Sequence, residues 1–446
     1  MTGRSVPWLS RMGGALMTLV VTTVVVAQQP PPLSPNPEEA LAKKAFNAGK
    51  LDEALQHLQA VSKANPTFGP PKVVASRWYL ETGQGEQARL LLEQAASEDP
   101  NHPDVLLTNA MYALREGRLT DTILSCSAAL SAAENPRWDA EAKKRYQREA
   151  RLGRAAALEI RGDFASMKAD LLALLEGDAK NSQLRVRLAR ANFLLNRPED
   201  AFTDLQRAFA DDPTLDPPEL GMAQLWTSKQ DFAKADEWYG KAIAAHPKSA
   251  AVHRAFTAYL VDRGRIDTAK THLAAAQQLD PTSLDTKALG GLVARYAKDY
   301  PTAATIFEEL IKTNPTYRNG FASANLALVL AESGDTKAKQ RAVEFANVYA
   351  QQNPRIAEAR AILAYTLYKS GRTADAEKVM REAVALGALP PDGAYFVAVI
   401  LADRGQYEDA YRVVKASLEN TAGSAYRKEA ETLRAELEKK LPPPKK

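Results

Sequence analysis

The sequence predicts an all-α fold, a solenoid of about eleven antiparallel helix pairs followed by a C-terminal capping helix. The first observation is a proline that recurs every 34 residues, at Pro213, Pro247, Pro281 and Pro315. The second is a set of small residues that return in the same register in each unit. The third is a glycine between the two halves of most units. A fixed period of this length is typical of a repeat array, in which each unit packs against its neighbours.

The recurring proline marks the end of each unit. Proline lacks the N–H group that a helix needs, and it disfavours helical geometry at the residue before it. One helix of each pair is therefore expected to end just before this proline. Positions in the repeat are numbered from 1 to 34, with the proline at position 32.

Small residues occupy position 8 in the first helix of a pair and position 20 in the second. Position 8 is Ala42, Ser76, Ala110, Ala155, Ala189, Ala223, Thr257, Gly291, Ala327, Ala364 and Ala398. Position 20 is Ala54, Ala88, Thr122, Met167, Ala201, Ala235, Ala269, Ala303, Ala342, Ala376 and Ala410. Two helices can approach closely only where the side chains between them are small. Both positions are therefore predicted to lie where the paired helices touch.

Position 15 is predicted to be the turn between the two helices. Glycine stands there as Gly49, Gly83, Gly117, Gly162, Gly264, Gly334, Gly371 and Gly405. Glycine accepts the positive φ with which many helices end. In the unit that ends at Pro247, the turn is expected at Gln230 and Asp231 instead.

The small residue at position 8, the glycine at 15, a bulky side chain at 17, the alanine at 20 and the proline at 32 together resemble the tetratricopeptide repeat family. The resemblance covers roughly residues 35–420, although the Trp at position 4 and the Tyr at position 11 that the family favours are mostly missing. It implies a right-handed superhelix of helix pairs, with a concave face lined by the first helix of each pair. It also implies that this face holds a protein or a peptide.

Residues 1–27 are predicted to be a secretory signal peptide. Arg4 and Arg11 are their only charged side chains, residues 13–26 are apolar or small, and Ala27 follows two valines at the expected cleavage point. The alternative is an uncleaved N-terminal membrane anchor, although the apolar run is shorter than the roughly 20 residues that span a bilayer. We therefore expect an exported protein, periplasmic or extracellular, with residues 28–37 as a proline-rich spacer.

The repeats divide into two predicted blocks, with repeats 1–3 in residues 38–134 and repeats 4–11 in residues 148–420. Residues 135–147 between them are interpreted as an insertion or a lengthened helix, or alternatively as a hinge. A smaller excess follows Gly334, where residues 335–341 are expected to extend the turn. Residues 421–446 are predicted to be a capping helix and a tail, since a terminal repeat needs a polar outer face.

Composition and motifs argue against catalysis. The net charge of +4 is mild, so nucleic acid is not expected as a partner. Cys126 is the only cysteine in the sequence, which excludes a disulfide framework, and it is expected to be a buried, small apolar residue. The five histidines do not have metal-binding spacing, and the sequence contains no phosphate-binding loop or nucleophile motif. We therefore expect no enzyme, no cofactor and no metal site.

Positions 2, 5, 9, 12 and 13 of the first helices face the groove if the family geometry applies. They supply the predicted partner-binding residues, which are Lys43, Phe46, Asn47, Arg77, Arg115, Arg190, Phe193, Gln224, Arg254, Arg295, Tyr296, Tyr365, Tyr368 and Tyr395. The strip is predicted to be basic at first and rich in tyrosine near its end. Arginine and tyrosine are enriched at protein interfaces. The expected partner is therefore a protein or peptide, possibly an acidic one.

The predicted function is that of a non-catalytic interaction scaffold in cell-envelope assembly or secretion. One alternative is a scaffold that handles or exports polysaccharide, with the groove tyrosines stacked on sugar rings. Another is an RNA-binding helical repeat, which the near-neutral charge disfavours. The sequence does not define an oligomeric state.

Overall fold

The computed structural model describes residues 37–65, 68–314, 320–420 and 423–441. These residues form 23 α-helices. The described chain divides into an N-terminal unit that ends at Ala235 and a C-terminal unit that begins at Asp236. The predicted signal peptide, 1–27, and spacer residues 28–36 lie outside the described residues.

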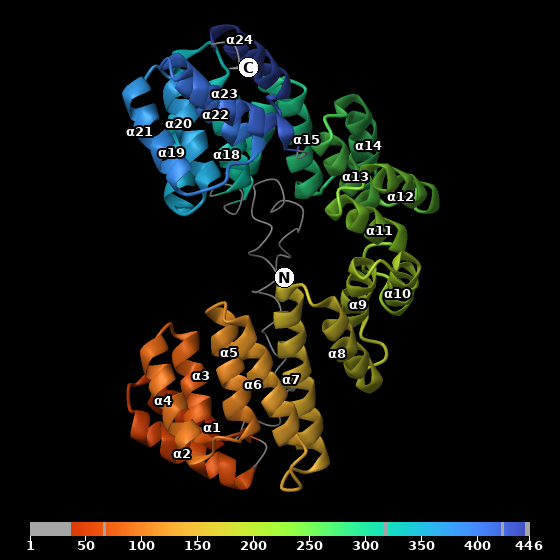
Figure 1. Cartoon of the computed structure of the whole chain (residues 1–446), viewed down its shortest axis with the longest axis vertical. Helices are drawn as coiled ribbons and strands as arrows, with labels where there is room; N and C mark the ends of the chain where they lie inside the picture. Colours follow the sequence, from red (N-terminus) through yellow and green to blue (C-terminus); the bar gives the residue numbers. More distant parts are fainter. Residues whose placement is uncertain (1–36, 66–67, 315–319, 421–422, 442–446) are drawn as a thin grey trace, which may run out of the picture. The chain divides into compact units, whose positions relative to one another are not determined.

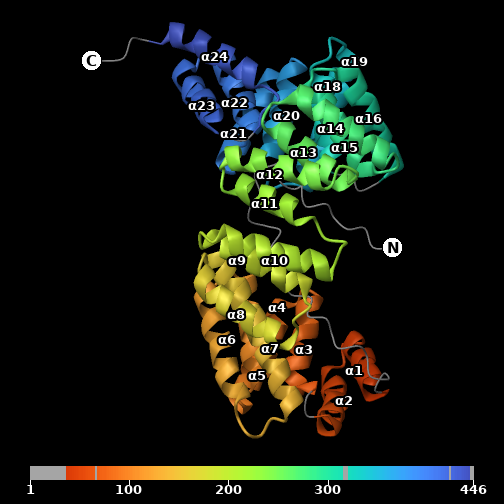
Figure 2. The same cartoon turned by 90° about the vertical axis from the view of Figure 1, so that its right-hand side faces the viewer.

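The N-terminal unit is built from consecutive helix pairs (Figure 1). Its helices are α1 (Pro37–Asn47), α2 (Leu51–Ala64), α3 (Pro71–Glu81), α4 (Gly85–Glu98), α5 (Pro103–Arg115), α6 (Leu119–Ala133), α7 (Ala140–Arg161), α8 (Phe164–Gly177), α9 (Ser182–Leu194), α10 (Pro198–Asp211), α11 (Pro218–Ser228) and the start of α12 (Phe232–Ala245). Figure 2 shows α9 and α10 side by side, after α7 and α8.

The C-terminal unit continues the same pairing. Its helices are the rest of α12, then α13 (Ala250–Asp262), α14 (Ile266–Leu279), α15 (Leu284–Tyr296), α16 (Tyr300–Thr313), α18 (Phe321–Ala331), α19 (Thr336–Gln352), α20 (Ala357–Lys369), α21 (Thr373–Ala385), α22 (Pro391–Asp403), α23 (Tyr407–Glu419) and α24 (Arg427–Lys440). The described helices therefore make eleven pairs, α1–α2 to α22–α23, and one terminal helix. The predicted all-α fold is confirmed.

The small residues at positions 8 and 20 lie where the sequence predicts them. Every side chain at these positions is 0–3% exposed, and even Met167, which stands in place of alanine, is fully buried. Gly291 shows why small size is required there. A Cβ atom added to this glycine would lie 2.7 Å from Cε1 of Phe307, in the second helix of the same pair.

The turns at position 15 adopt the left-handed conformation almost throughout. The glycines there have φ between +69° and +83°, with one exception. The three units that lack glycine use the same conformation, with φ of 59° at Asn196, 61° at Gln230 and 62° at Lys298. The backbone geometry is therefore kept even where the side chain disfavours it.

Gly334 is the exception, and the expectation of an extended turn at residues 335–341 is wrong. Gly334 is absent from the positive-φ residues, and α19 begins at Thr336. The Asp335 side chain caps this helix by accepting hydrogen bonds from the backbone N–H groups of Lys337 and Ala338, both at 3.1 Å. The additional residues of this unit thus lengthen a helix, which has 17 residues.

The region predicted as an insertion, 135–147, leads into α7. This helix has 22 residues, and Asp139 caps its start by accepting from the Ala142 N–H group at 2.8 Å. Tyr146, in the added part of the helix, is fully buried in a cluster with Cys126 and Ala150. None of the described helices is both long enough and apolar enough to span a bilayer.

Candidate functional site

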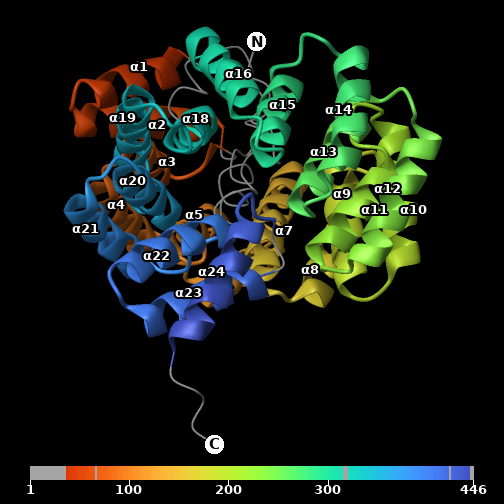
Figure 3. The same cartoon turned by 90° about the horizontal axis from the view of Figure 1, so that it is seen from above.

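The predicted binding residues lie on the first helix of each pair. We call the surface formed by positions 2, 5, 9, 12 and 13 of these helices the first-helix face. In the C-terminal unit, α15, α18, α20 and α22 follow one another around an arc (Figure 3).

At the start of the N-terminal unit, Lys43 and Phe46 belong to one cluster. Phe46 is 8% exposed and makes edge contacts with the rings of Trp78 and Tyr79, at centroid distances of 5.3 and 4.7 Å. The Nζ atom of Lys43 lies 4.3 Å from the centroid of Trp78 and 3.6 Å from a carboxylate oxygen of Glu81. Phe46 therefore presents little surface to a partner, and Lys43 is already paired.

Arg77 is held by the buried carboxylate of Asp104. Asp104 is 1% exposed and accepts hydrogen bonds from Arg77 at 3.2 Å, from Arg145 at 3.0 and 3.2 Å, and from the Tyr146 hydroxyl at 3.1 Å. Burial alone would raise the pKa of Asp104, but the two guanidinium groups outweigh it and hold the pKa below its usual value. Three consecutive first helices are thus joined by one carboxylate.

Arg190 shares a second carboxylate with Arg187. Glu159 has a side chain that is 8% exposed, and it accepts from Arg187 at 3.0 Å and from Arg190 at 3.2 Å. The side chain of Arg190 remains 49% exposed, so one side of its guanidinium still faces solvent. Arg190 is therefore fixed in orientation by the repeat before its own.

Asn47 and Arg115 are exposed. No ion pair or hydrogen bond of the Arg115 guanidinium occurs within the described residues. Gln224 donates a hydrogen bond to Asp216 at 3.1 Å, and Phe193 is 1% exposed against the ring of Trp226. Asn47 and Arg115 are thus exposed predicted residues of the N-terminal unit, as is Arg190.

Arg295 is buried in the C-terminal unit. It is 6% exposed, and it donates hydrogen bonds to Oδ1 of Asn325 at 2.9 Å and to Oδ2 of Asp392 at 2.7 Å. Arg254 is paired less tightly, with 3.5 Å between Nη1 and Oδ2 of Asp280. Asp392 lies at the start of α22, so this contact links α15 to a helix three pairs further along the chain.

Two more acidic side chains lie near this contact. Burial raises the pKa of Glu358 to about 7, with a further contribution from the charge of Asp392, while Arg295 acts in the opposite direction. Burial also raises the pKa of Asp262, at the end of α13. This part of the face thus contains more carboxyl groups than one arginine neutralises.

The predicted tyrosines form an aromatic cluster in the C-terminal unit. Tyr365 is 2% exposed, and its hydroxyl donates to Oε1 of Glu332 at 2.6 Å. Tyr296, Tyr368 and Tyr395 are partly buried and pack against the same core. A ring as buried as that of Tyr365 has no free face on which a sugar could stack.

Position 2 of the repeat supplies the functional residues that sequence reasoning missed. Asp104, Glu358 and Asp392 all stand there, among the positions expected to face the groove. Their common position in the repeat is visible in the sequence, but the predicted strip contained only basic, aromatic and amide side chains. Asp104 and Asp392 neutralise Arg77 and Arg295. Lys43, Arg190 and Arg254 pair with carboxylates at other positions, so most of the predicted basic strip is locally neutralised.

Histidines are brought together at one place. Nδ1 of His253 lies 3.1 Å from Nδ1 of His272, and Nε2 of His253 lies 3.1 Å from the carbonyl oxygen of Pro247. A carbonyl only accepts, so Nε2 of His253 donates to it and Nδ1 accepts from His272. In the part of the chain that the structure describes, no group of three or more His, Cys, Asp or Glu side chains is placed to hold a metal ion.

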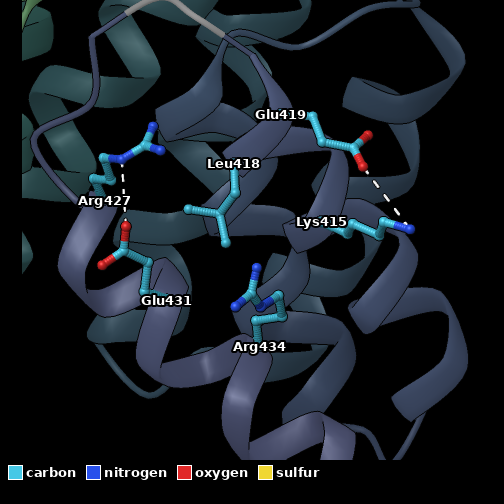
Figure 4. Close-up of a pocket in the computed structure, with 6 residues that line it drawn as sticks. All are labelled: Lys415, Leu418, Glu419, Arg427, Glu431 and Arg434. Carbon is cyan, nitrogen blue, oxygen red and sulfur yellow. Dashed lines mark ion pairs between the residues drawn. The ribbon is translucent and has the colours of Figure 1, made fainter.

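A shallow depression lies between α23 and α24 (Figure 4). It is lined by Lys415, Leu418, Glu419, Arg427, Glu431 and Arg434. Lys415 pairs with Glu419 at 3.8 Å and Arg427 with Glu431 at 3.3 Å. These are ion pairs within one helix between exposed side chains, which indicates a solvated surface.

Two family models match the chain, and both are described as tetratricopeptide repeat. One matches residues 45–111 and the other residues 362–425. No curated protein matches the sequence. The two matched segments lie in different units, so each unit contains a recognisable repeat of this kind.

Solved structures similar to the chain include yeast Tom70, with 14% identity, 90% of this chain and 95% of that chain covered, and a TM-score of 0.38. The Cut9–Hcn1 hetero-tetramer of APC/C has 14% identity, coverage of 81% and 75%, and a TM-score of 0.41. A tetratricopeptide repeat protein from Parabacteroides merdae has 13% identity, coverage of 65% and 99%, and a TM-score of 0.34.

Proposed function

Because the chain is a tetratricopeptide-repeat protein, and such repeats typically bind proteins or peptides, we propose that it is a non-catalytic scaffold that holds a protein or an extended peptide on its first-helix face. The observation that carries this proposal is the fixed orientation of the polar groups on that face. Asp104 holds Arg77, and Glu159 holds Arg190. Groups already held in place lose little side-chain entropy when a partner binds.

We expect Arg115 to contact the partner directly. Its guanidinium is exposed, whereas most other arginines of the face are paired with carboxylates. An acidic side chain of the partner would therefore find its strongest opposite charge there. The preference for an acidic partner rests on this side chain and on the exposed part of Arg190.

Site-specific photo-crosslinking tests the proposal. A photoreactive residue at position 115, on α5, is expected to give adducts with one partner in an extracytoplasmic fraction. The matched control is position 124 on α6, because Leu124 is 64% exposed on the second helix of the same pair. Adducts at position 124 but not at 115 would overturn the proposed face.

A charge reversal gives an independent measurement with the captured partner. Arg115→Glu is expected to weaken binding about tenfold, which corresponds to the loss of about 1.4 kcal/mol. Arg207→Glu is the control, since Arg207 is exposed on the second helix α10. Equal affinities of the two variants would exclude Arg115 from the interface.

We further propose that the chain is exported to the periplasm or outside the cell, where it serves cell-envelope assembly or secretion. Support comes from residues 1–27, with two arginines ahead of an apolar run and small residues at its end. Mass spectrometry of the native protein is expected to find Gln28 as its first residue. Recovery of the chain from membranes with Met1 or residues 2–27 retained would instead support the anchored form.

A further inference from the structure

Residues 423–426, which precede α24, pack against the first-helix face of their own unit. The structure describes Gly423, Ser424, Ala425 and Tyr426 in contact with residues of α13, α15, α20 and α22 or next to them. We call these four residues the docked segment. They occupy the surface formed by Arg295, Tyr365 and Tyr395, three residues that are predicted from the sequence to bind a partner.

Side chains of the face bind both backbone polar groups of Ala425 in the docked segment. The N–H group of Ala425 donates to Oδ1 of Asp392 at 3.0 Å, and the carbonyl oxygen of Ala425 accepts from Nζ of Lys298 at 2.7 Å. The Ser424 hydroxyl donates to the same Asp392 oxygen at 2.6 Å. Side chains that satisfy the two backbone groups of one residue are a means of holding a peptide segment.

The ring of Tyr426 fills an aromatic site. Tyr426 is 3% exposed, its ring stacks on Tyr395 at a centroid distance of 5.2 Å, and it makes edge contacts with Phe396 at 5.1 Å and Tyr365 at 5.9 Å. Nζ of Lys298 lies 4.7 Å from its centroid. Aromatic anchors in such surroundings contribute strongly to peptide binding.

Gly423 adds a size requirement. A Cβ atom at this residue would lie 2.3 Å from the backbone oxygen of Asp262, at the end of α13. Only glycine therefore fits this contact without movement. The face thus contacts the docked segment at three successive points. These are Gly423, the Ser424 hydroxyl with the backbone of Ala425, and the ring of Tyr426.

The terminal helix α24 does not need the docked segment for its own packing. Ala430 and Leu437 are each 1% exposed in a cluster with Ala410 and Val414 of α23. Release of the segment would therefore open the first turn of α24, which Tyr426 caps and whose Glu429 pairs with Lys298, while Ala430 and Leu437 could stay packed on α23. Ala425 and Tyr426 pack in an apolar cluster, but the segment also contacts two charged groups, Asp392 and Arg295. A purely structural contact would gain more from apolar residues in place of these two charges.

From this geometry we infer that Lys298, Tyr365, Asp392 and Tyr395 form a peptide-binding site for a Gly-Ser-Ala-Tyr-like segment of a partner protein, bound in a turn conformation, and that the chain's own residues 423–426 fill it until the partner displaces them. This inference rests on the proposed scaffold function and names the partner segment. A site that is filled most of the time binds a competing peptide weakly, because the apparent affinity is the intrinsic affinity multiplied by the fraction of molecules in which the site is open.

The test uses the full chain and a fluorescein-labelled peptide with the sequence of residues 423–429, Gly-Ser-Ala-Tyr-Arg-Lys-Glu. Gly423→Ala forces the docked segment off Asp262, so the variant is expected to bind the peptide at least about tenfold more tightly than the unmodified chain, measured by fluorescence anisotropy. Gly240→Ala is the matched control, because a Cβ there has no neighbour within 4 Å. It is expected to bind as weakly as the unmodified chain.

Two further changes identify the site. In the Gly423→Ala chain, Asp392→Asn is expected to weaken peptide binding about tenfold, since one hydrogen-bonded charge is lost. A peptide with alanine in place of tyrosine is expected not to bind. Tyr426→Ala in the full chain provides a second way to free the site, should Gly423→Ala fail to fold.

Hydrogen exchange at the Ala425 amide reports whether the segment has left the face. Faster exchange in Gly423→Ala or Tyr426→Ala without peptide binding would overturn the inference. Slow exchange in both variants would also overturn it, because the segment would then be a permanent part of the core. Neither result affects crosslinking at position 115, so the proposed scaffold function is tested independently of this inference.

Discussion

Arg295 and Asp392 are joined by a hydrogen bond of 2.7 Å although 97 residues separate them in the sequence. Both side chains are largely buried, with 8% and 15% of their surfaces exposed. The contact connects two first helices of the C-terminal unit that are not neighbours in the chain.

Asp392→Ala is expected to lower the free energy of unfolding of the C-terminal unit by about 3 kcal/mol, because the Arg295 charge would stay buried without its partner. Urea denaturation followed by circular dichroism measures the change. Adding Arg295→Met to the variant is expected to restore most of the loss. The control is Asp409→Ala, since Asp409 and Arg412 form an exposed pair for which a loss within about 0.5 kcal/mol is expected. A similar, small effect of both alanine variants would contradict the buried contact.

Glu358→Gln is expected to change how stability depends on pH. The pKa of Glu358 rises from 4.5 to about 7 on folding, mainly because of burial. The folded state therefore disfavours ionisation of Glu358, so the contribution of this group to stability is fully present below pH 4.5 and is lost as the pH rises through 7, by up to about 3 kcal/mol. The glutamine variant should lack this fall and exceed the unmodified chain in stability at pH 8. Parallel pH profiles of the two proteins between pH 5 and 8 would contradict this explanation.

Gly291→Ala tests the close approach of α15 and α16. The added Cβ would lie 2.7 Å from the Phe307 ring, which is fully buried, so we expect a loss of about 1–3 kcal/mol. Gly240→Ala makes the same change in α12 where the Cβ meets no atom within 4 Å. It should increase stability by up to about 1 kcal/mol, because alanine favours the helix. Thermal unfolding distinguishes the two, and the same sign of change in both would refute the packing argument.

Gln230→Gly is expected to raise the stability of the N-terminal unit by about 0.5–1 kcal/mol. Gln230 has φ of 61° at the turn before α12, a conformation that is unfavourable for side chains other than glycine. Gln230→Ala keeps the Cβ atom and therefore serves as the control, with no gain expected. Denaturation midpoints measure the difference, and an equal gain in both variants would point to the side chain rather than to the backbone.

The repeat could be predicted from the sequence because its determinants are local. Position 8, position 20 and the turn at position 15 each reflect contacts within one helix pair, and Asn196 and Lys298 keep the turn geometry of their register. Gly334 could not be assigned in this way, because the cap from Asp335 starts a longer helix.

The site was less predictable because its partners come from different repeats. Arg77 lies one repeat away from Asp104, and Arg295 lies three repeats away from Asp392. A 34-residue period indicates which side chains share a face, but not which of them form pairs. The docked segment was expected to belong to a capping helix, whereas Ser424, Ala425 and Tyr426 precede α24 and lie on the face.

The contact of residues 423–429 with α13 and α15 affects how the C-terminal unit unfolds. A linear repeat array frays from its last repeat, because each unit is stabilised only by its neighbours. Here Lys298 pairs with Glu429 at 2.8 Å, so the last helix is tied to the eighth pair. The terminal repeat cannot fray without also exposing Arg295, and the repeats from α15 to α24 should melt in one cooperative transition. Closing so long a loop also makes these contacts late events in folding.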